Sequence, residues 1–217
     1  MTSLRNQVSN RETASVAQLW NDHPMRLPST AAVTFLVLLV LAAEFFLQGG
    51  ALEYRRALLY SQPWRLFTGH FAHISLLHAM VNCVALLLLE RLFAERMRAW
   101  ELWAVILGTP VVISLAFWLA MPGLIWFRGL SAVLHALYFA GCVLWWRTSI
   151  RRARWLPIVA IAGGALKVLF EQPWSETFPW AGWLGAPVVP QSHLIGALAG
   201  IAAGLWFAAR RKIQQTR

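Results

Sequence analysis

The sequence predicts an all-α, polytopic membrane protein with six transmembrane helices and both termini in the cytoplasm. Of its 217 residues, 59% are hydrophobic and 13% are charged, and the mean hydropathy is +0.55. Such a composition is far too apolar for a soluble domain of this length. The apolar residues gather in runs close to the roughly 20 residues that a helix needs to span hydrocarbon, and Lys and Arg lie between them.

The six predicted helices cover residues 30–48, 74–93, 101–121, 129–146, 155–170 and 192–209. The first follows a polar tail and lacks a convincing cleavage signal, so we interpret it as a retained helix rather than a signal peptide. The fifth carries Lys167 four residues before Glu171, a spacing that permits an internal ion pair and favours a distorted or mobile helix.

A single membrane domain accounts for most of the chain. We predict a cytoplasmic tail at 1–28, a six-helix domain at 29–210 and a basic cytoplasmic tail at 211–217, with no internal repeat. The fifth loop is rich in tryptophan, with Trp174, Trp180 and Trp183. This loop is interpreted either as a cap and lateral gate or as an anchor at the membrane interface.

The orientation follows from the distribution of basic residues. One side holds Arg5, Arg11, Arg26, Arg91, Arg96, Arg98, Arg147, Arg151, Arg152, Arg154, Arg210, Arg211, Lys212 and Arg217. The other side holds only Arg55, Arg56, Arg65 and Arg128. By the positive-inside rule both termini are cytoplasmic, and the same rule explains the net charge of +10, so no nucleic-acid partner is expected.

Polar residues stand near the start of the three helices that run inward from the outer surface. His78 and Asn82 begin the second helix, Ser131 the fourth and His193 the sixth. All four are predicted to lie on the order of 5–10 Å deep, at 1.5 Å per residue. Polar groups are costly in lipid, and a serine needs a base to become a nucleophile, so this set predicts a functional site.

The fourth and sixth helices carry matching stripes of small residues. These are Ala132, Ala136 and Ala140 on one helix and Gly196, Gly200 and Gly204 on the other. Such stripes are common in membrane bundles and let two backbones approach closely. Because Ser131 and His193 head the two faces, close packing is predicted to bring the serine hydroxyl within hydrogen-bond reach of the imidazole.

The four-residue spacing of His78 and Asn82 puts both side chains on one helix face. An amide and an imidazole aimed at one point are typical of an oxyanion hole, whose donors meet the developing negative charge. The alternative is that both residues only cap a wet helix end. From spacing alone, the two interpretations are equally supported.

Several segments resemble the signatures of the rhomboid intramembrane serine proteases. They are Trp64-Arg65-Leu66-Phe67-Thr68, His73-Ile74-Ser75-Leu76-Leu77-His78 with Asn82, Gly129-Leu130-Ser131-Ala132, and His193-x-x-Gly196-x-x-x-Gly200. The resemblance extends from about residue 60 to 205 in the family's order. It departs from the G-x-S-G motif at Ala132, which keeps the face small.

The resemblance implies a Ser–His dyad without a cofactor or metal. Ser131 would be the nucleophile and His193 the general base, while His78, Asn82 and the Ser131 backbone N–H would bind the oxyanion. Gly129 and His135 would support the site. No suitably placed Asp or Glu is expected, so another group must orient the imidazole.

The residue four after Ser131, where many rhomboids carry a tyrosine that stacks on the catalytic ring, is His135. The pattern Gly129-x-Ser131-x-x-x-His135 resembles the rhombosortase branch. That resemblance implies a multi-pass enzyme of the cell inner membrane, whose partners are the lipid bilayer and transmembrane-segment protein substrates. These would be exported proteins with a C-terminal tag of a Gly-Gly pair, an apolar helix and a basic end.

Two other kinds of function remain open from the sequence. His70, His73 and His78 lie close together, as in a metal site, but the H-E-x-x-H spacing of helical zinc hydrolases is absent. A non-catalytic rhomboid-like protein that binds membrane clients, or a transporter, would also be polytopic. Non-catalytic rhomboid-like proteins usually lack the Ser or the His. Transporters tend to show repeats and broken helices.

Overall fold

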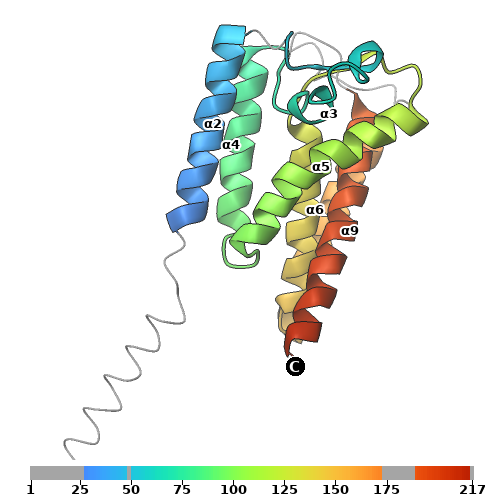
Figure 1. Cartoon of the computed structure of the whole chain (residues 1–217). Helices are drawn as coiled ribbons and strands as arrows, with labels where there is room; N and C mark the ends of the chain where they lie inside the picture. Colours follow the sequence, from blue (N-terminus) through green and yellow to red (C-terminus); the bar gives the residue numbers. More distant parts are fainter. Residues whose placement is uncertain (1–26, 48–49, 173–188, 216–217) are drawn as a thin grey trace, which may run out of the picture.

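The computed structural model describes residues 27–47, 50–172 and 189–215 (Figure 1). Its long helices are α2 (Leu27–Leu47), α4 (Leu76–Phe93), α5 (Ala99–Ala120), α6 (Ser131–Thr148), α7 (Trp155–Phe170) and α9 (Pro190–Gln215). The first five lie within three residues of their predicted runs, whereas α9 continues six residues past the predicted end at 209 into the predicted C-terminal tail. The mostly helical bundle confirms the all-α class. Most of the predicted N-terminal tail and the tryptophans of the fifth loop lie outside the described residues.

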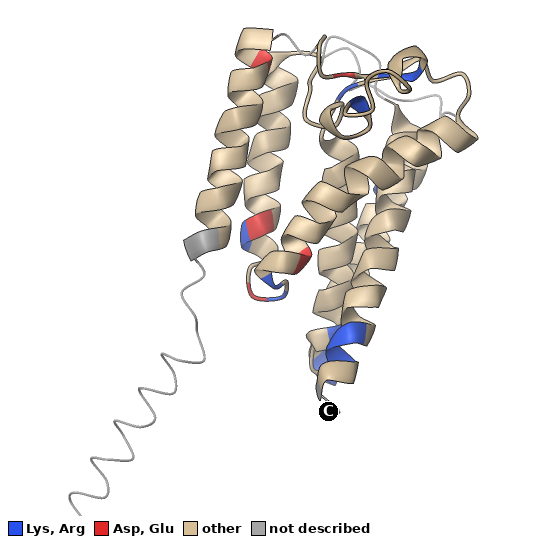
Figure 2. Ribbon diagram, viewed as in Figure 1, with Lys and Arg blue, Asp and Glu red and all other residues tan. Residues whose placement is uncertain are grey.

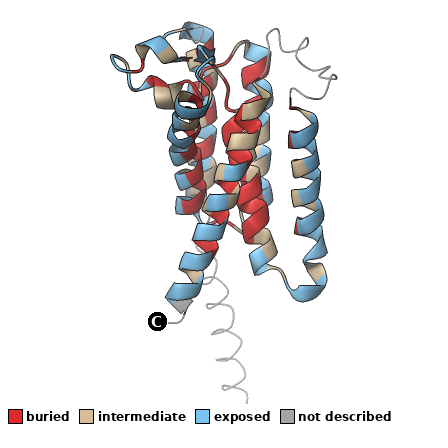
Figure 3. Ribbon diagram, turned by 90° about the vertical axis from the view of Figure 1, so that its right-hand side faces the viewer, coloured by how far each residue is buried: buried red, intermediate tan, exposed pale blue. Residues whose placement is uncertain are grey.

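Five helices in the described part of the chain are long and apolar enough to cross a membrane, namely α2, α4, α5, α7 and α9. The other long helix, α6, carries polar residues at both ends, among them Ser131, His135 and Arg147. Its neighbours α4, α5, α7 and α9 all pack against it. It is therefore the buried centre of the bundle (Figure 3).

Helix α2 lies at one edge of the bundle (Figure 1), and most residues of α7 are not buried (Figure 3). Many of the exposed residues on both helices are large and apolar. In α7 only Pro157 and Val168 are buried. Exposed apolar side chains such as Phe35 of α2 and Phe170 of α7 suit a hydrocarbon surrounding rather than water. The short helix η2 (Arg151–Ala153) leads into α7.

The small-residue stripes meet along the α6–α9 seam, which confirms the predicted close packing. A Cβ added at Gly196 or Gly200 would overlap the carbonyl oxygen of Ala132 or Ala136, respectively. At Gly204, an added Cβ would lie 2.9 Å from the Ala140 carbonyl oxygen. Glycine at these positions therefore sets the distance between the two helices.

Gly200→Ala is expected to slow any reaction catalysed at the start of these helices by about a hundredfold. Displacement of a reacting group by about 1 Å can lower the rate that much. The added methyl must push α9 away from the Ala136 carbonyl. Gly108→Ala in α5 is the matched control, since a Cβ there meets nothing within 4 Å. Turnover per folded protein is the measurement, and equal turnover in both variants would contradict the role of the seam.

Loop elements cover the end of the bundle where α4, α6 and α9 begin (Figure 1). They are β1 (Tyr54–Arg55), η1 (Arg56–Leu58), α3 (Arg65–Thr68) and β2 (Trp126–Phe127). The two short strands pair antiparallel, and Gly129 N donates to Gly69 O at 3.2 Å. Buried Arg65 donates to Glu53 O at 2.8 Å. These bonds tie the Trp64-Arg65 segment to the loop that precedes α6.

Candidate active site

Three helices begin at the site and aim their N-termini at it. Ser131 is the first residue of α6, His78 is the third of α4 and His193 is the fourth of α9. The first backbone N–H groups of a helix have no partner within it, and the helix dipole is positive at this end. The arrangement therefore favours a negative charge that develops beside Ser131.

Ser131 and His193 are in direct contact. The Ser131 Oγ lies 2.9 Å from His193 Nε2, and His193 is 5% exposed. The distance is within the normal range for a hydrogen bond. The structure therefore joins a hydroxyl to a base across the α6–α9 seam, where both helices begin.

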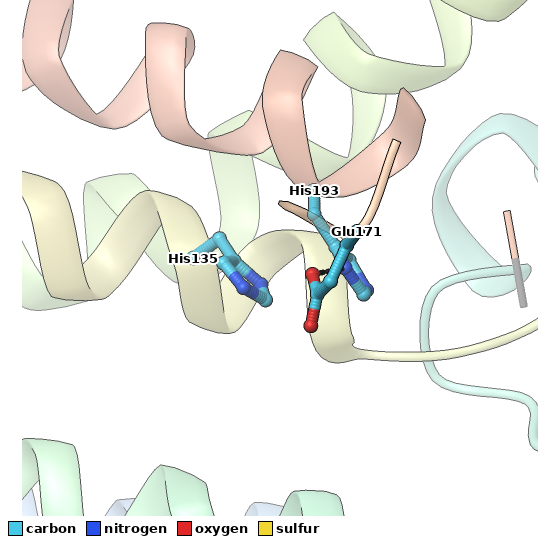
Figure 4. A group of neighbouring side chains, drawn as sticks. All are labelled: His135, Glu171 and His193. Carbon is cyan, nitrogen blue, oxygen red and sulfur yellow. Dashed lines mark hydrogen bonds and ion pairs between the residues drawn. The ribbon is translucent and has the colours of Figure 1, made fainter. Parts of the chain in front are cut away.

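A carboxylate contacts the other nitrogen of the same ring, which corrects the expectation that no acid lies there. Glu171, at the end of α7, has Oε2 at 2.8 Å from His193 Nδ1 (Figure 4). Its predicted ion pair with Lys167 is also present. Because α7 ends at the end of the bundle where α6 and α9 begin, Glu171 lies at the level of Ser131 and His193.

His135 lies between Ser131 and Lys167 and stacks on the His193 ring. The two ring centroids are 4.2 Å apart with an interplanar angle of 16°. His135 Nδ1 lies 2.7 Å from the Ser131 carbonyl oxygen, and Lys167 Nζ lies 3.1 Å from His135 Nε2. The stacking fixes the plane of the imidazole that contacts the serine.

The local charges keep Glu171 ionised. Burial raises the pKa of this carboxyl, but hydrogen bonds from His193 and Lys167 and the charges of both outweigh burial and bring the pKa to about 2. The carboxylate is therefore charged near neutral pH. It meets His193 as a permanent acceptor.

The same cluster has the composition of a possible metal site. Ligand atoms of His135, Glu171 and His193 all lie within 4.8 Å of one another. However, the Lys167 ammonium contacts both His135 and Glu171. The Lys167 ammonium thus already places a positive charge beside the atoms that would bind a metal cation.

The histidines of the first loop are arranged differently. His70 Nε2 lies 3.0 Å from Ser114 Oγ, and His73 packs edge-on against His78 with centroids 5.1 Å apart. Burial lowers the pKa of His70 and of His73 to about 3. Both rings are therefore neutral and buried. His70 is directed toward Ser114, which does not support the predicted alternative of a metal site formed with His73 and His78.

A pocket opens beside the serine. Its lining residues are Ile74, His78, Gly123, Leu124, Ile125, Trp126, Phe127, Arg128, Ser131 and Val189. Gly129 has a φ of +134°, a conformation that favours glycine, and a Cβ there would lie 3.0 Å from His78 Cε1. Gly129 therefore lets the His78 ring approach the loop that leads into Ser131.

The structure separates the two predicted oxyanion donors. His78 lines the pocket with Ser131, whereas Asn82 is buried one turn deeper and does not line it. The Asn82 Nδ2 has no hydrogen-bond partner among the described residues. The residue that caps the start of α4 is Ser75, whose Oγ accepts from His78 N at 3.2 Å. An unpaired buried amide is costly unless a ligand completes it.

Comparison with known proteins agrees with the motifs quoted above. The Rhomboid domain matches residues 60–210, which is more than half of the chain. No curated protein matches the sequence. The matched residues include α4, α6 and most of α9, which carry the site, and α7, which carries Lys167. The chain therefore belongs to the rhomboid family, a family of membrane proteins that are generally serine intramembrane proteases.

Proposed function

We propose that the protein is a serine endopeptidase that cleaves transmembrane segments of other proteins. The observation that carries the proposal is the 2.9 Å contact between Ser131 Oγ and His193 Nε2 at the N-terminus of α6, in a chain of the rhomboid family. The pocket beside Ser131 supports it, because a reacting carbonyl group needs space next to the nucleophile. A client-binding protein or a transporter would not need this pair.

In the proposed reaction, Ser131 Oγ attacks the carbonyl carbon of the scissile bond and its proton passes to His193 Nε2. The carbonyl oxygen becomes an oxyanion, which the Ser131 backbone N–H, His78 and Asn82 would stabilise. When the C–N bond breaks, His193 gives the proton to the leaving amine. Water then attacks the acyl-enzyme with His193 again as the base, which releases a carboxylate and restores the Ser131 hydroxyl.

The orientation in the membrane is part of the proposal. We place six spans in the cell inner membrane, with both termini in the cytoplasm and the site near the outer face. The basic residues Arg210, Arg211 and Lys212 at the end of α9 farthest from the site support this orientation (Figure 2). Cleavage would then release the outer part of a substrate from the membrane.

His135 supports our proposal for the substrate class. The stacked pair of His135 and His193 supports assignment to the rhombosortase-like branch, because the ring occupies the place of the tyrosine in many rhomboids. We therefore propose exported proteins whose C-terminal tag has a Gly-Gly pair, an apolar helix and a basic end as substrates. Purified protein in vesicles should cleave such a tag, and a chelator should leave the rate unchanged.

His135→Ala is expected to reduce cleavage severely, because it removes the stacked ring and the contact with the Ser131 carbonyl. His135→Tyr should keep part of the activity on a generic rhomboid substrate but lose more on the tagged substrate. The measurement compares both substrates in detergent with the wild type and the two variants. Equal rates in all three enzymes would make His135 a packing residue and remove the support for the branch.

A further inference from the structure

The carboxylate of Glu171 is a titratable group at the site that the reaction described above does not use. Its side chain is 13% exposed, and its two oxygens have different partners. Oε1 pairs with the Lys167 ammonium, while Oε2 lies 2.8 Å from His193 Nδ1 (Figure 4). A carboxylate that served only Lys167 would not need to turn its second oxygen toward an imidazole.

The partners of His135 determine which of its nitrogens carries the proton. The Ser131 carbonyl oxygen can only accept, so His135 Nδ1 donates to it. The Lys167 ammonium can only donate, so His135 Nε2 accepts from it. The stacked ring is therefore neutral, and no positive charge lies against the face of His193.

The same reasoning applies to His193. The ionised Glu171 can only accept, so His193 Nδ1 carries the proton and donates to Oε2. His193 Nε2 is then free to accept from the Ser131 hydroxyl. This is the tautomer that a general base needs in order to take the proton of a serine.

These contacts close into a ring that begins and ends at one residue. In order, the ring runs from Ser131 Oγ through His193, Glu171, Lys167 and His135 to the Ser131 carbonyl oxygen. Each of these contacts joins a donor to an acceptor. The buried members of such a network are paired, and an unpaired charge among them would be costly.

The backbone next to Glu171 is also anchored. Gln172 is 1% exposed, and its Nε2 donates to Val168 O at 2.9 Å and to Pro190 O at 3.1 Å. The second bond joins the end of α7 to the first residue of α9. This link holds the carboxylate beside His193, although α7 is otherwise loosely packed.

We propose that Glu171 is a positioning residue that acts through His193, with Lys167 holding its carboxylate in place. The inference rests on the proposed endopeptidase function. Glu171 keeps the His193 ring in the productive tautomer and stabilises the imidazolium that forms when Ser131 attacks. The proton stays on His193 Nε2 until the leaving amine takes it, and Glu171 takes no proton at any step.

Glu171→Gln is the first test, because it keeps the shape of the side chain and removes its charge. We expect kcat to fall about ten- to a hundredfold with little change in KM. This loss is smaller than the roughly 10⁴-fold loss from an amide in a soluble serine protease triad, since the stacked His135 still orients the ring. The acid limb of the pH profile of kcat/KM should move to lower pH by about one unit.

Lys167→Met is the second test. It should move the acid limb of the pH profile in the direction opposite to the shift in Glu171→Gln. Charged or titratable groups that face His193 are Glu171 and Lys167 from α7, His135 from α6 and His78 from α4. Removal of the ammonium leaves the carboxylate unshielded, so the imidazolium is more stable and the acid limb moves to higher pH. Opposite shifts from two neighbouring residues are not expected from a general loss of packing.

Glu90→Gln is the matched control. Glu90 is also a buried carboxylate, but it bonds Ser29 and Thr30 near the other end of α4, so its pH profile should match the wild type. Wild-type rates in Glu171→Gln, or lower rates without a shift in either variant, would overturn the positioning role. If Ser131→Ala also cleaved the substrate, the proposed function itself would fail instead.

Discussion

Ser131→Ala and His193→Ala are each expected to abolish cleavage of a transmembrane substrate. The first variant lacks the nucleophile, and the second lacks the group that takes its proton. Neither residue of the 2.9 Å contact can catalyse the reaction without the other. Because the two residues act as a unit, the double variant should be no slower than either single variant. Cleavage in vesicles, measured per inserted protein, is the test.

Ser114→Ala is the control for this prediction. Ser114 is also buried and lies 3.0 Å from a histidine nitrogen, that of His70. This second Ser–His contact is fully enclosed, and neither of its residues lines the pocket beside Ser131. Ser114→Ala should therefore keep its activity, whereas substantial cleavage by both Ser131→Ala and His193→Ala would contradict the account.

Asn82→Ala is expected to lower turnover by roughly ten- to a thousandfold, the range for one preorganised oxyanion donor, with a smaller effect on KM. The unpaired Asn82 Nδ2 is the observation behind this prediction. Asn82 does not line the pocket, so the prediction requires that substrate binding brings the oxyanion within reach of its amide.

The neighbouring residue supplies the control for Asn82. Cys83→Ala also shortens a buried side chain of α4 but removes no oxyanion donor, so its turnover should stay near that of the wild type. Wild-type turnover in Asn82→Ala would assign Asn82 to the structure of α4. A rise in KM with unchanged kcat would assign it to substrate binding instead.

Most of the fold could be predicted because hydropathy and small-residue spacing are local properties of the chain. The stripes on α6 and α9 predicted their seam, since only glycine lets a helix approach the carbonyl of Ala136 so closely. Residues 129–146 are predicted as an apolar run, but α6 is not among the five helices apolar enough to cross a membrane, and its neighbours rather than lipid surround it. The central helix can therefore carry more polar residues than the edge helices.

The site could be predicted only in part, for a physical reason. Ser131 and His193 stand at the starts of helices, so their depths follow from chain direction. The sequence links Glu171 only to Lys167, because the spacing of four residues explains that pair without reference to any other helix. Its second contact depends on how α7 is rotated against α9, which no periodicity in this sequence determines.

Reaction of the purified protein with a fluorophosphonate tests the central claim most directly, because this reagent bonds covalently to an activated serine oxygen. The account predicts one adduct, located on Ser131 by peptide mass spectrometry, which is lost in Ser131→Ala and formed far more slowly in His193→Ala. An adduct on another residue, or none on Ser131 in protein that still cleaves the tagged substrate, would contradict it.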